Sequence, residues 1–464
     1  GLGDVYKRQT IDSAVENATA LYYQNALFRF YALGNIKTLT KKMCIDNAML
    51  ILLDGRINEV GRPNENFARE LFELHTIGRG PEKATLGDYT NYTEADIKVA
   101  ARILSGWKND NDFAEIDIIT GLPTGIITGE GQYATRHDAS ITPERKFSEA
   151  FQNTVISHAA ELILNPSTID EQTVANVVDG KARKESVKDQ VSQLVDMIFN
   201  QRATAENFCR KIYRFFVYYD ITADVETNVI SPMADTFTAS NFEILPVIKE
   251  LLCSQYFYDN NNAITTDNTH GDIIKSPLEV TLGAMLFFNV VTPLASTSLE
   301  KYYDFYDGLL GSLNNQGIQL YEPYDVAGYD AYHQEPDFNR NWITVNTLAY
   351  RYEFTLKLAR NTFSEMISIN LSEYVKANVT APTNPSNIVQ HFVDYMLPEV
   401  ISTGSESRFE FFLNILKGDK DLPDSNWTNE WNLYLARPDL PDAVNGQLQD
   451  FLAAIMQTPE YQLM

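Results

Sequence analysis

The chain has 464 residues, enough for one large or two moderate domains, and 44% of them are hydrophobic, which is sufficient for a sizeable core. Acidic residues outnumber basic ones by 62 to 37, so the net charge is -25. This balance disfavours nucleic acid and anionic membranes as partners, and it would suit cationic partners or a divalent metal. The 3 cysteines are odd in number and far apart, which predicts no disulfide framework. No apolar run approaches the ~20 residues of a transmembrane segment.

The first nine residues, GLGDVYKRQ, resemble translated adaptor sequence found at the ends of metagenomic contigs. We therefore expect residues 1–9 to be a non-native leader, with the natural N-terminus and any export signal missing from this fragment. We expect residues 10–464 to form one large helical domain, or two lobes that divide near residues 258–272.

Helical periodicity dominates the chain and predicts a mainly α fold, a large multi-helix domain with long loops. The clearest start signals are Thr93, followed three residues later by Asp96, and the run Ser276-Pro277-Leu278-Glu279. Helices are expected over residues 14–33, 93–106, 187–199, 204–217 with Thr204 as the cap, 276–288 and 447–457.

Strand signals are sparse. Residues 116–128, IDIITGLPTGIIT, place β-branched runs on both sides of the turn sequence 121–125 and predict a small β-hairpin insertion at the surface. Two polar stretches, 257–275 and 314–340, are expected to be loops. The sequence has no repeat of 20 to 50 residues, which argues against a solenoid.

The segment NENFARELFELHTIGRG, residues 64–80, concentrates acidic and basic side chains, and we call it the signature segment. On a helical wheel its polar line comprises Glu65, Arg69 and Glu73, with Glu70 beside it. Its apolar face comprises Phe67, Leu71 and Leu74, and His75 falls near Leu71 and Ala68. The polar line fits either a solvated ladder of ion pairs or a buried polar network. A site that used Glu70 with His75 would need the helix to end near Leu74, or ligands from another segment.

His137-Asp138 follows Tyr133 in a predicted loop. A neutral imidazole beside a carboxylate could bind a divalent metal or act as a general base. The alternative is a loop histidine that caps a nearby helix or bonds to the backbone. His158, in the stretch VISHAAELIL, is interpreted as a structural residue of a helix.

A late loop rich in aromatic and acidic residues contains Tyr329, His333 and, at its end, Trp342. Aromatic faces pair with the apolar faces of sugars, so this loop is a candidate glycan-binding element. It could equally be a long loop packed by its own side chains. Cys209, in contrast, lies on an apolar helical stripe and is expected to be a core residue.

Several landmarks occur in a characteristic order: MLILLD at 49–54, the signature segment, YTEADIKVAARILSGW at 92–107, His137-Asp138, Lys146-Phe147, FCRKIYRFFV at 208–217, IKSPLEV at 274–280, Trp342 and Arg351. Together they resemble the bacterial family catalogued as domain of unknown function 1800, over roughly residues 20–464. The resemblance implies a helical architecture and export to the periplasm or the cell exterior, and it supplies no agreed activity. The family usually begins well upstream, so this copy looks N-terminally truncated. Its late loop is often richer in paired prolines and ends Gly-Trp, unlike residues 321–329 here, which puts the role of that loop in doubt.

Two functions remain open. The first is an exported hydrolase or metal-assisted enzyme, with Glu70, Glu73, His137 and Asp138 in one pocket and Arg69 holding an anionic group. The second is a non-catalytic envelope or surface protein that binds a glycan or a protein partner through residues 314–342, with the signature segment as a structural clamp. The binding candidates across both are Glu65, Arg69, His75, Tyr329, His333 and Trp342. The sequence has no P-loop, dinucleotide fingerprint or nucleophile elbow. It identifies no cofactor, and a divalent metal would suit the first function.

Overall fold

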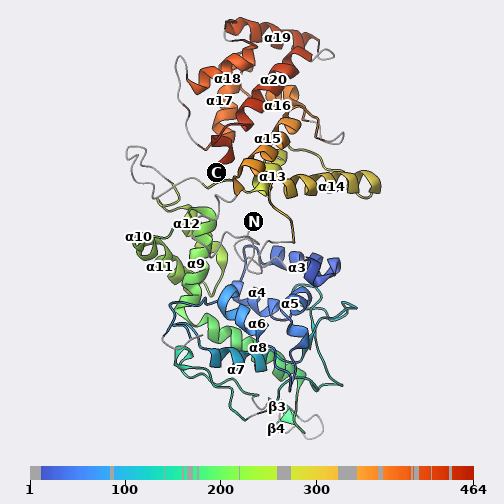
Figure 1. Ribbon diagram of the computed structural model, residues 1–464, viewed down its shortest axis with the longest axis vertical. Coiled ribbons are helices and arrows are strands. Elements are labelled where there is room, and N and C mark those ends of the chain that lie inside the picture. The colour runs from blue at the N-terminus through green and yellow to red at the C-terminus, as the bar shows by residue number, and fades with distance from the viewer. Residues whose placement is uncertain are drawn as a thin grey trace. The chain divides into compact units, whose positions relative to one another are not determined.

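The structure is a computed structural model. It describes residues 12–83, 88–140, 142–158, 161–164, 171–174, 177–218, 220–258, 273–321, 342–363, 369–398, 401, 407–419, 421–437 and 442–464. For residues 12–13, 161–164, 171–174 and 442–443 the description covers the backbone alone. The contacts divide the chain into two compact units (Figure 1). Among the described residues, unit 1 comprises 12–258 with Tyr321, and unit 2 comprises 273–320 and 342–464.

Unit 1 contains a helical core and a few short strands, coloured blue to green in Figure 1. Its helices are α2 (Asp12–Val15), α3 (Ala18–Phe30), α4 (Ile36–Met43), α5 (Asn47–Leu52), α6 (Asn66–Glu70), α7 (Glu94–Ile103), α8 (Lys184–Phe199), α9 (Arg202–Phe216), α10 (Ala223–Val225), α11 (Ser231–Ala239) and α12 (Ile244–Leu252). Two 3-10 turns, η1 (Gly55–Ile57) and η3 (Glu149–Phe151), and two π-helical turns, η2 (Leu71–His75) and η4 (Glu226–Ile230), join them. The mainly α prediction is confirmed.

The strands form antiparallel pairs: β1 (Trp107–Lys108) with β2 (Ile126–Ile127), β3 (Glu161–Leu164) with β4 (Glu171–Val174), and β5 (Val177–Val178) with β6 (Lys181–Ala182). The two β-branched runs of residues 116–128 do not pair with each other as predicted. The narrow turn between them closes where the Asp117 N–H donates to the Leu122 carbonyl at 2.9 Å, with Ile116 opposite Pro123. The second β-branched run pairs instead with the strand that follows α7, Trp107 facing Ile127.

Local capping chemistry explains where several helices begin. Thr93 and Ser276 each form the predicted reciprocal capping box with the residue three positions later. Thr204 is not a cap, and that prediction is wrong. Helix α9 begins at Arg202, and the Thr204 hydroxyl donates to the Ile198 carbonyl at 2.6 Å, which ties the start of α9 to the end of α8.

The predicted helix over 14–33 is interrupted at its start. Glu16 has a left-handed backbone (φ 50°), so α2 ends at Val15. Asn17 then caps α3 by accepting the Ala20 N–H at 3.0 Å. A short polar cap can therefore split an apolar helical pattern in two.

Helix α7 lies at the centre of the site region because it packs against both α6 and α8. Its predicted apolar stripe is buried, and Ile97 and Ala100 are fully buried. Cys209 on α9 is also fully buried in the same core, as predicted. The core therefore holds α6, α7, α8 and α9 in fixed register with one another.

Unit 2 is a helical body with its own core, coloured yellow to red in Figure 1. Helix α20 contacts α15, α16, α18 and α19 and is its central element. The indoles of Trp427 and Trp431 stack in this core, with ring centroids 5.6 Å apart. The helices are α13 (Pro277–Phe287), α14 (Leu299–Asn315), α15 (Val345–Ala359), α16 (Leu371–Asn378), α17 (Pro385–Met396), α18 (Arg408–Lys417), α19 (Asp424–Ala436) and α20 (Asp442–Met456), followed by the 3-10 turn η6 (Glu460–Gln462).

Across the part of the chain that the structure describes, no helix combines the length and the apolar character needed to cross a membrane.

Candidate functional site

The signature segment begins as an α-helix and continues as a π-helical turn. Helix α6 covers Asn66–Glu70 and η2 covers Leu71–His75. A π turn hydrogen-bonds from i to i+5 and therefore shifts every later side chain around the axis. As a result Phe72 is fully buried, whereas Leu74, predicted to face the core, is only half-buried. His75 is buried, on the apolar side where the wheel placed it.

Side chains from α9 close the end of this π turn. The Lys211 ammonium donates to the Leu74 carbonyl at 2.6 Å, and the Asn207 amide donates to the Thr76 carbonyl at 2.6 Å. The Thr76 hydroxyl donates to the Leu71 carbonyl at 2.5 Å. The last carbonyls of a helix have no partner within the helix. The bonds from Lys211 and Asn207 therefore fix the signature segment to α9.

The predicted line of Glu65, Arg69 and Glu73 splits into two separate ion pairs. Arg69 binds Glu94, in the first turn of α7, through two bonds, one of them 2.8 Å long, and it lies 3.5 Å from Glu65. Hydrogen bonding by Arg69 lowers the pKa of Glu94. Glu73 is paired instead with Arg79.

Tyr92 also reaches Glu73, and its hydroxyl donates to the Glu73 carboxylate at 3.2 Å. Glu70 differs from its neighbours. Its Oε2 atom is buried and has no hydrogen-bond partner among the described residues. Burial, and then the charge of Glu73, raise its pKa, against the opposing charges of Arg69 and Arg79. Glu70 is therefore the carboxyl in this segment that is best disposed to hold a proton.

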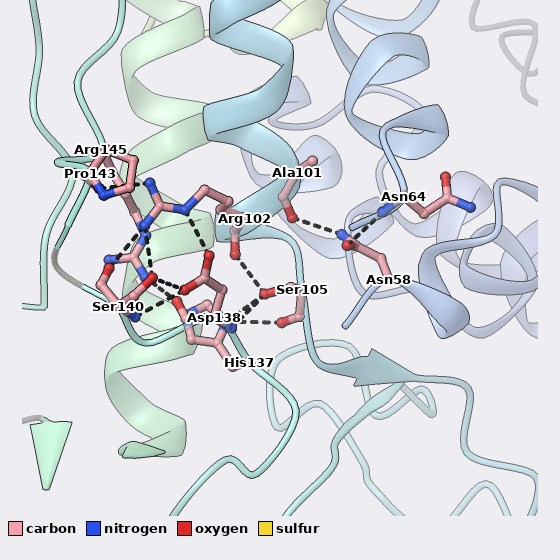
Figure 2. A network of polar contacts seen from close by, with 10 residues as sticks. All are labelled: Asn58, Asn64, Ala101, Arg102, Ser105, His137, Asp138, Ser140, Pro143 and Arg145. Carbon is pink, nitrogen blue, oxygen red and sulfur yellow. Dashed lines mark hydrogen bonds and ion pairs between the residues drawn. The ribbon is translucent and has the colours of Figure 1, made fainter. Parts of the chain in front are cut away.

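His137-Asp138 packs against the residues that follow α7 (Figure 2). The His137 Nδ1–H donates to the Ser105 carbonyl at 2.9 Å, and the Asp138 N–H donates to the Ser105 hydroxyl at 2.8 Å. Gly106 permits this close approach. It has φ +85°, and a Cβ placed there would lie 2.6 Å from the backbone nitrogen of His137, too close for any other residue. Burial lowers the pKa of His137 to about 4, against the hydrogen bond to Ser105, so its imidazole is neutral at pH 7.

Asp138 is held charged by its surroundings. Its carboxylate accepts the Arg102 Nε–H at 2.7 Å and the Ser140 N–H at 2.9 Å, and it also accepts the Ser140 hydroxyl. Burial opposes ionisation, but the hydrogen bonds from Ser140 and Arg102 outweigh it and lower the pKa of Asp138. The buried Arg145 donates to the Asp138 carbonyl, as Figure 2 shows.

The last carbonyls of α7 are capped by the same network. The Ser105 hydroxyl donates to the Arg102 carbonyl at 2.6 Å. The Asn58 amide donates to the Ala101 carbonyl at 2.7 Å, and its oxygen accepts the N–H of Asn64, the first residue of the signature segment. Figure 2 shows Asn58 and His137-Asp138 meeting the end of α7 from two different segments. Two of the last carbonyls of this helix are therefore capped by side chains.

The two groups of predicted site residues contact opposite ends of α7. Arg69 contacts it at Glu94, and Asp138 contacts it at Arg102. Eight residues of α-helix separate these positions, a rise of about 12 Å at 1.5 Å per residue. Within the described residues, no three His, Cys, Asp or Glu side chains converge as a metal-binding group. The shared pocket of Glu70, Glu73, His137 and Asp138 stays a prediction.

Two of the remaining candidates, Tyr329 and His333, lie outside the described residues. Trp342 is half-buried, and its carbonyl accepts the Thr347 hydroxyl at 3.0 Å before α15. His158 does not lie on a helix, which corrects that prediction. The residues before it are irregular and β3 follows.

The decisive comparison is with protein families. The chain matches the family described as Protein of unknown function (DUF1800) over residues 9–463. It belongs to this family. No curated protein and no solved structure matches it.

For this DUF1800 member, the resemblance drawn from the ordered landmarks is confirmed. Several of these landmarks contact one another in the fold. The Ser105-Gly106 pair at the end of one landmark receives His137-Asp138 of another, and Lys211 of a third closes the signature segment.

Sequence reasoning missed four residues that organise these contacts: Arg102, Ser105, Asn207 and Lys211. The Ser-Gly pair directly after an apolar helical stripe was a local signal for a helix end. Nothing near Asn207 or Lys211 in the sequence signals their roles. Both lie more than 130 positions from the carbonyls that they bind.

Proposed function

We propose that this DUF1800 protein is an exported, non-catalytic carbohydrate-binding protein. In this proposal, unit 1 is a rigid scaffold whose signature segment and His137-Asp138 loop act as structural clamps, and a neutral sugar binds a groove in unit 2. The proposed export rests on the family resemblance. Fractionation of cells that express the complete natural gene tests it.

Support for the clamp comes from how three of the four candidate catalytic residues, all but Glu70, are used. Asp138 is bonded to Arg102 and Ser140, and the His137 Nδ1–H is bonded to the Ser105 carbonyl. Glu73 is paired with Arg79. A general base must reach the proton it abstracts, and these groups already serve the ends of α7 and η2.

The observation that carries the binding proposal is a groove of ≈ 340 Å³ between α14 and α15 in unit 2. Its lining combines three aromatic rings with small and polar side chains: Gly308, Gly311, Ser312, Asn315, Tyr350, Glu353, Phe354, Lys357 and Phe363. The volume lies at the lower end of the range of small-ligand sites. A groove of this size fits a short saccharide.

Two glycines keep this groove open. Gly308 and Gly311 lie inside the 17-residue helix α14, where each destabilises the helix by about 1 kcal/mol relative to alanine. A Cβ at either position would meet no atom within 4 Å, so close packing does not require a glycine there. Their absent side chains leave space above the buried ring of Phe354.

The groove chemistry suits sugar hydroxyls. The partly exposed rings of Tyr350 and Phe363 offer apolar faces for a pyranose ring. The Asn315 amide and the Glu353–Lys357 ion pair, 2.5 Å long, offer donors and acceptors beside them. An ion pair leaves the groove without a strong excess charge, which favours a neutral saccharide.

Saturation-transfer NMR with cellotetraose and chitotetraose tests the proposal on the full chain. We expect transfer to at least one sugar. Gly311→Leu, which fills the groove, should abolish the transfer without lowering the melting temperature. Gly283→Leu is the matched control, because Gly283 lies on α13 with equally open space and outside the groove. Absence of sugar binding by the wild type, or unchanged binding by Gly311→Leu, would overturn the proposal.

A further inference from the structure

Two histidines come together in unit 1, the buried His137 and the half-buried His158. The ring centroids of His137 and His158 are 5.3 Å apart, with the ring planes at 83°. His137 is 2% exposed. The two residues lie in different loops, and both approach α8, which carries Ser186 and Gln190 one turn apart.

Each ring has one nitrogen already bonded. The His137 Nδ1–H donates to the Ser105 carbonyl, which can only accept, so the tautomer of this ring is fixed and its Nε2 carries a lone pair. The His158 Nδ1 lies 2.6 Å from the Ser186 hydroxyl, whose oxygen can accept a hydrogen bond from the ring N–H in the same way. Metal-ligating histidines characteristically donate their second ring nitrogen to a carbonyl or another acceptor of this kind.

The opposite nitrogens have no hydrogen-bond partner among the described residues. This holds for Nε2 of His137, for Nε2 of His158, and for both polar atoms of the fully buried Gln190 amide. The Gln190 amide lies beside His137, and a loose hydrogen bond between them raises the pKa of His137, but its geometry is too poor to satisfy either group. A buried polar atom left unsatisfied destabilises a protein by about 1–3 kcal/mol, so several in one place indicate a missing polar species.

The ring separation is one that a shared metal ion would give. If two imidazoles bind one ion tetrahedrally through bonds of about 2.0 Å, their centroids lie about 5 Å apart. The observed 5.3 Å agrees with this arrangement. The charged groups acting on both rings are the Arg145 guanidinium and the Asp138 carboxylate, which oppose each other. A hard cation such as Ca²⁺ or Mg²⁺ would need several oxygen ligands, whereas Zn²⁺ favours imidazole nitrogen.

We infer that His137 and His158 bind one Zn²⁺ ion through their Nε2 atoms, with the amide oxygen of Gln190 as a third ligand. Because the site is buried, the ion has a structural role and fastens the two loops to α8. This inference is independent of the proposed sugar groove, which lies in unit 2.

The test uses the full chain, stripped of metal with a chelator and then titrated with ZnCl₂ or CoCl₂. We expect one Zn²⁺ per chain by elemental analysis after gel filtration, a higher melting temperature, and the visible absorption of tetrahedral Co²⁺. His158→Gln should weaken Zn²⁺ binding at least about tenfold. His391→Gln, a histidine bonded to Tyr374 in unit 2, is the matched control and should bind as the wild type does.

A second variant, Gln190→Glu, tests the site even if His158→Gln fails to fold. It keeps both histidines and adds an anionic oxygen, so it should bind Zn²⁺ more tightly than the wild type and keep the Co²⁺ spectrum. A wild-type chain that retains no Zn²⁺ after gel filtration would overturn the inference and indicate a buried water instead. Zn²⁺ binding that is unchanged in His158→Gln would overturn it equally.

Discussion

The two ends of α7 carry the same kind of ion pair in different surroundings. At the first turn, the side chains of Arg69 and Glu94 are 32% and 33% exposed. At the last turn, those of Arg102 and Asp138 are 15% and 18% exposed, and neutral hydrogen bonds from Ser140 complete the shell of the carboxylate.

This difference determines what each pair contributes. Water screens the partly exposed Arg69–Glu94 pair and can replace either partner, so this pair contributes little to stability. At the buried end, removal of one partner leaves the other charge without compensation, which is strongly destabilising. The signature segment is the more conspicuous of the two in sequence, yet we expect the His137-Asp138 end to matter more for stability.

The largest effect is expected for Asp138→Ala. It removes the carboxylate that pairs with Arg102 and leaves that guanidinium, still bonded to the neutral Ser140 and Pro143 carbonyls, beside the buried Arg145. We expect a loss of about 3–5 kcal/mol in the free energy of unfolding, measured by urea denaturation. Glu94→Ala at the other end is the control, with an expected loss below about 1 kcal/mol. Equal losses at both ends would invalidate the comparison.

Asp46, the N-cap of α5, extends the comparison to a buried carboxyl whose partners are neutral donors. It accepts the Gln24 amide at 2.7 Å and the Met49 N–H at 2.9 Å, but burial outweighs them and raises its pKa to about 6. The folded pKa exceeds the unfolded value of 3.8. The contribution of Asp46 to the free energy of unfolding is therefore complete below pH 3.8 and is lost as the pH rises through 6.

Asp46→Asn should therefore gain stability relative to the wild type by about 2–3 kcal/mol between pH 4 and pH 8. Urea denaturation at the two pH values measures this gain. Asp138→Asn should show the opposite trend when the measurements are extended below pH 3.8, the usual pKa of its carboxyl. The pKa of Asp138 is lowered, so its contribution is present above its unfolded pKa and is lost as the pH falls through the folded pKa. The same sign for both variants would refute this account.

A smaller loss is expected for Lys211→Met, which removes the donor to the partly buried Leu74 carbonyl. We expect about 1–2 kcal/mol less stability and faster hydrogen exchange in the amides of the signature segment. Lys188→Met on the exposed face of α8 is the control and should change stability by less than about 0.5 kcal/mol. Unchanged exchange in Lys211→Met would mean that α9 does not hold the π turn.

The helices were predictable where their signals are local. Thr93 and Ser276 bond to residues three positions away, so the capping boxes were visible in the sequence. The Trp107–Ile127 pairing was not visible, because a two-residue strand has no periodicity and its partner is distant. The π turn at Leu71 was also hidden, since a helical wheel assumes one constant period.

The site was predictable in residue type but not in arrangement. The sequence singled out His137 and Asp138 correctly as a polar pair with a special environment. Their partners, Ser105 and Arg102, lie more than 30 positions earlier and are brought close only by the packing of unit 1. Gln190 looks like any polar residue of an exposed helix face, although it is fully buried.

The smallest expected effect is the coupling between Arg69 and Glu94, measured by a double-mutant cycle with Arg69→Met and Glu94→Gln. The pair has two-bond geometry, which favours a measurable interaction, but both side chains are one-third exposed, which screens it. We expect a coupling of about 0.5–1 kcal/mol that falls as salt is raised from 0.05 to 0.5 M, values chosen to shorten the screening length from about 14 to about 4 Å. A salt-independent coupling above about 2 kcal/mol would place this end of α7 in the same class as Arg102–Asp138. The signature segment would then be as strong a structural clamp as the His137-Asp138 loop.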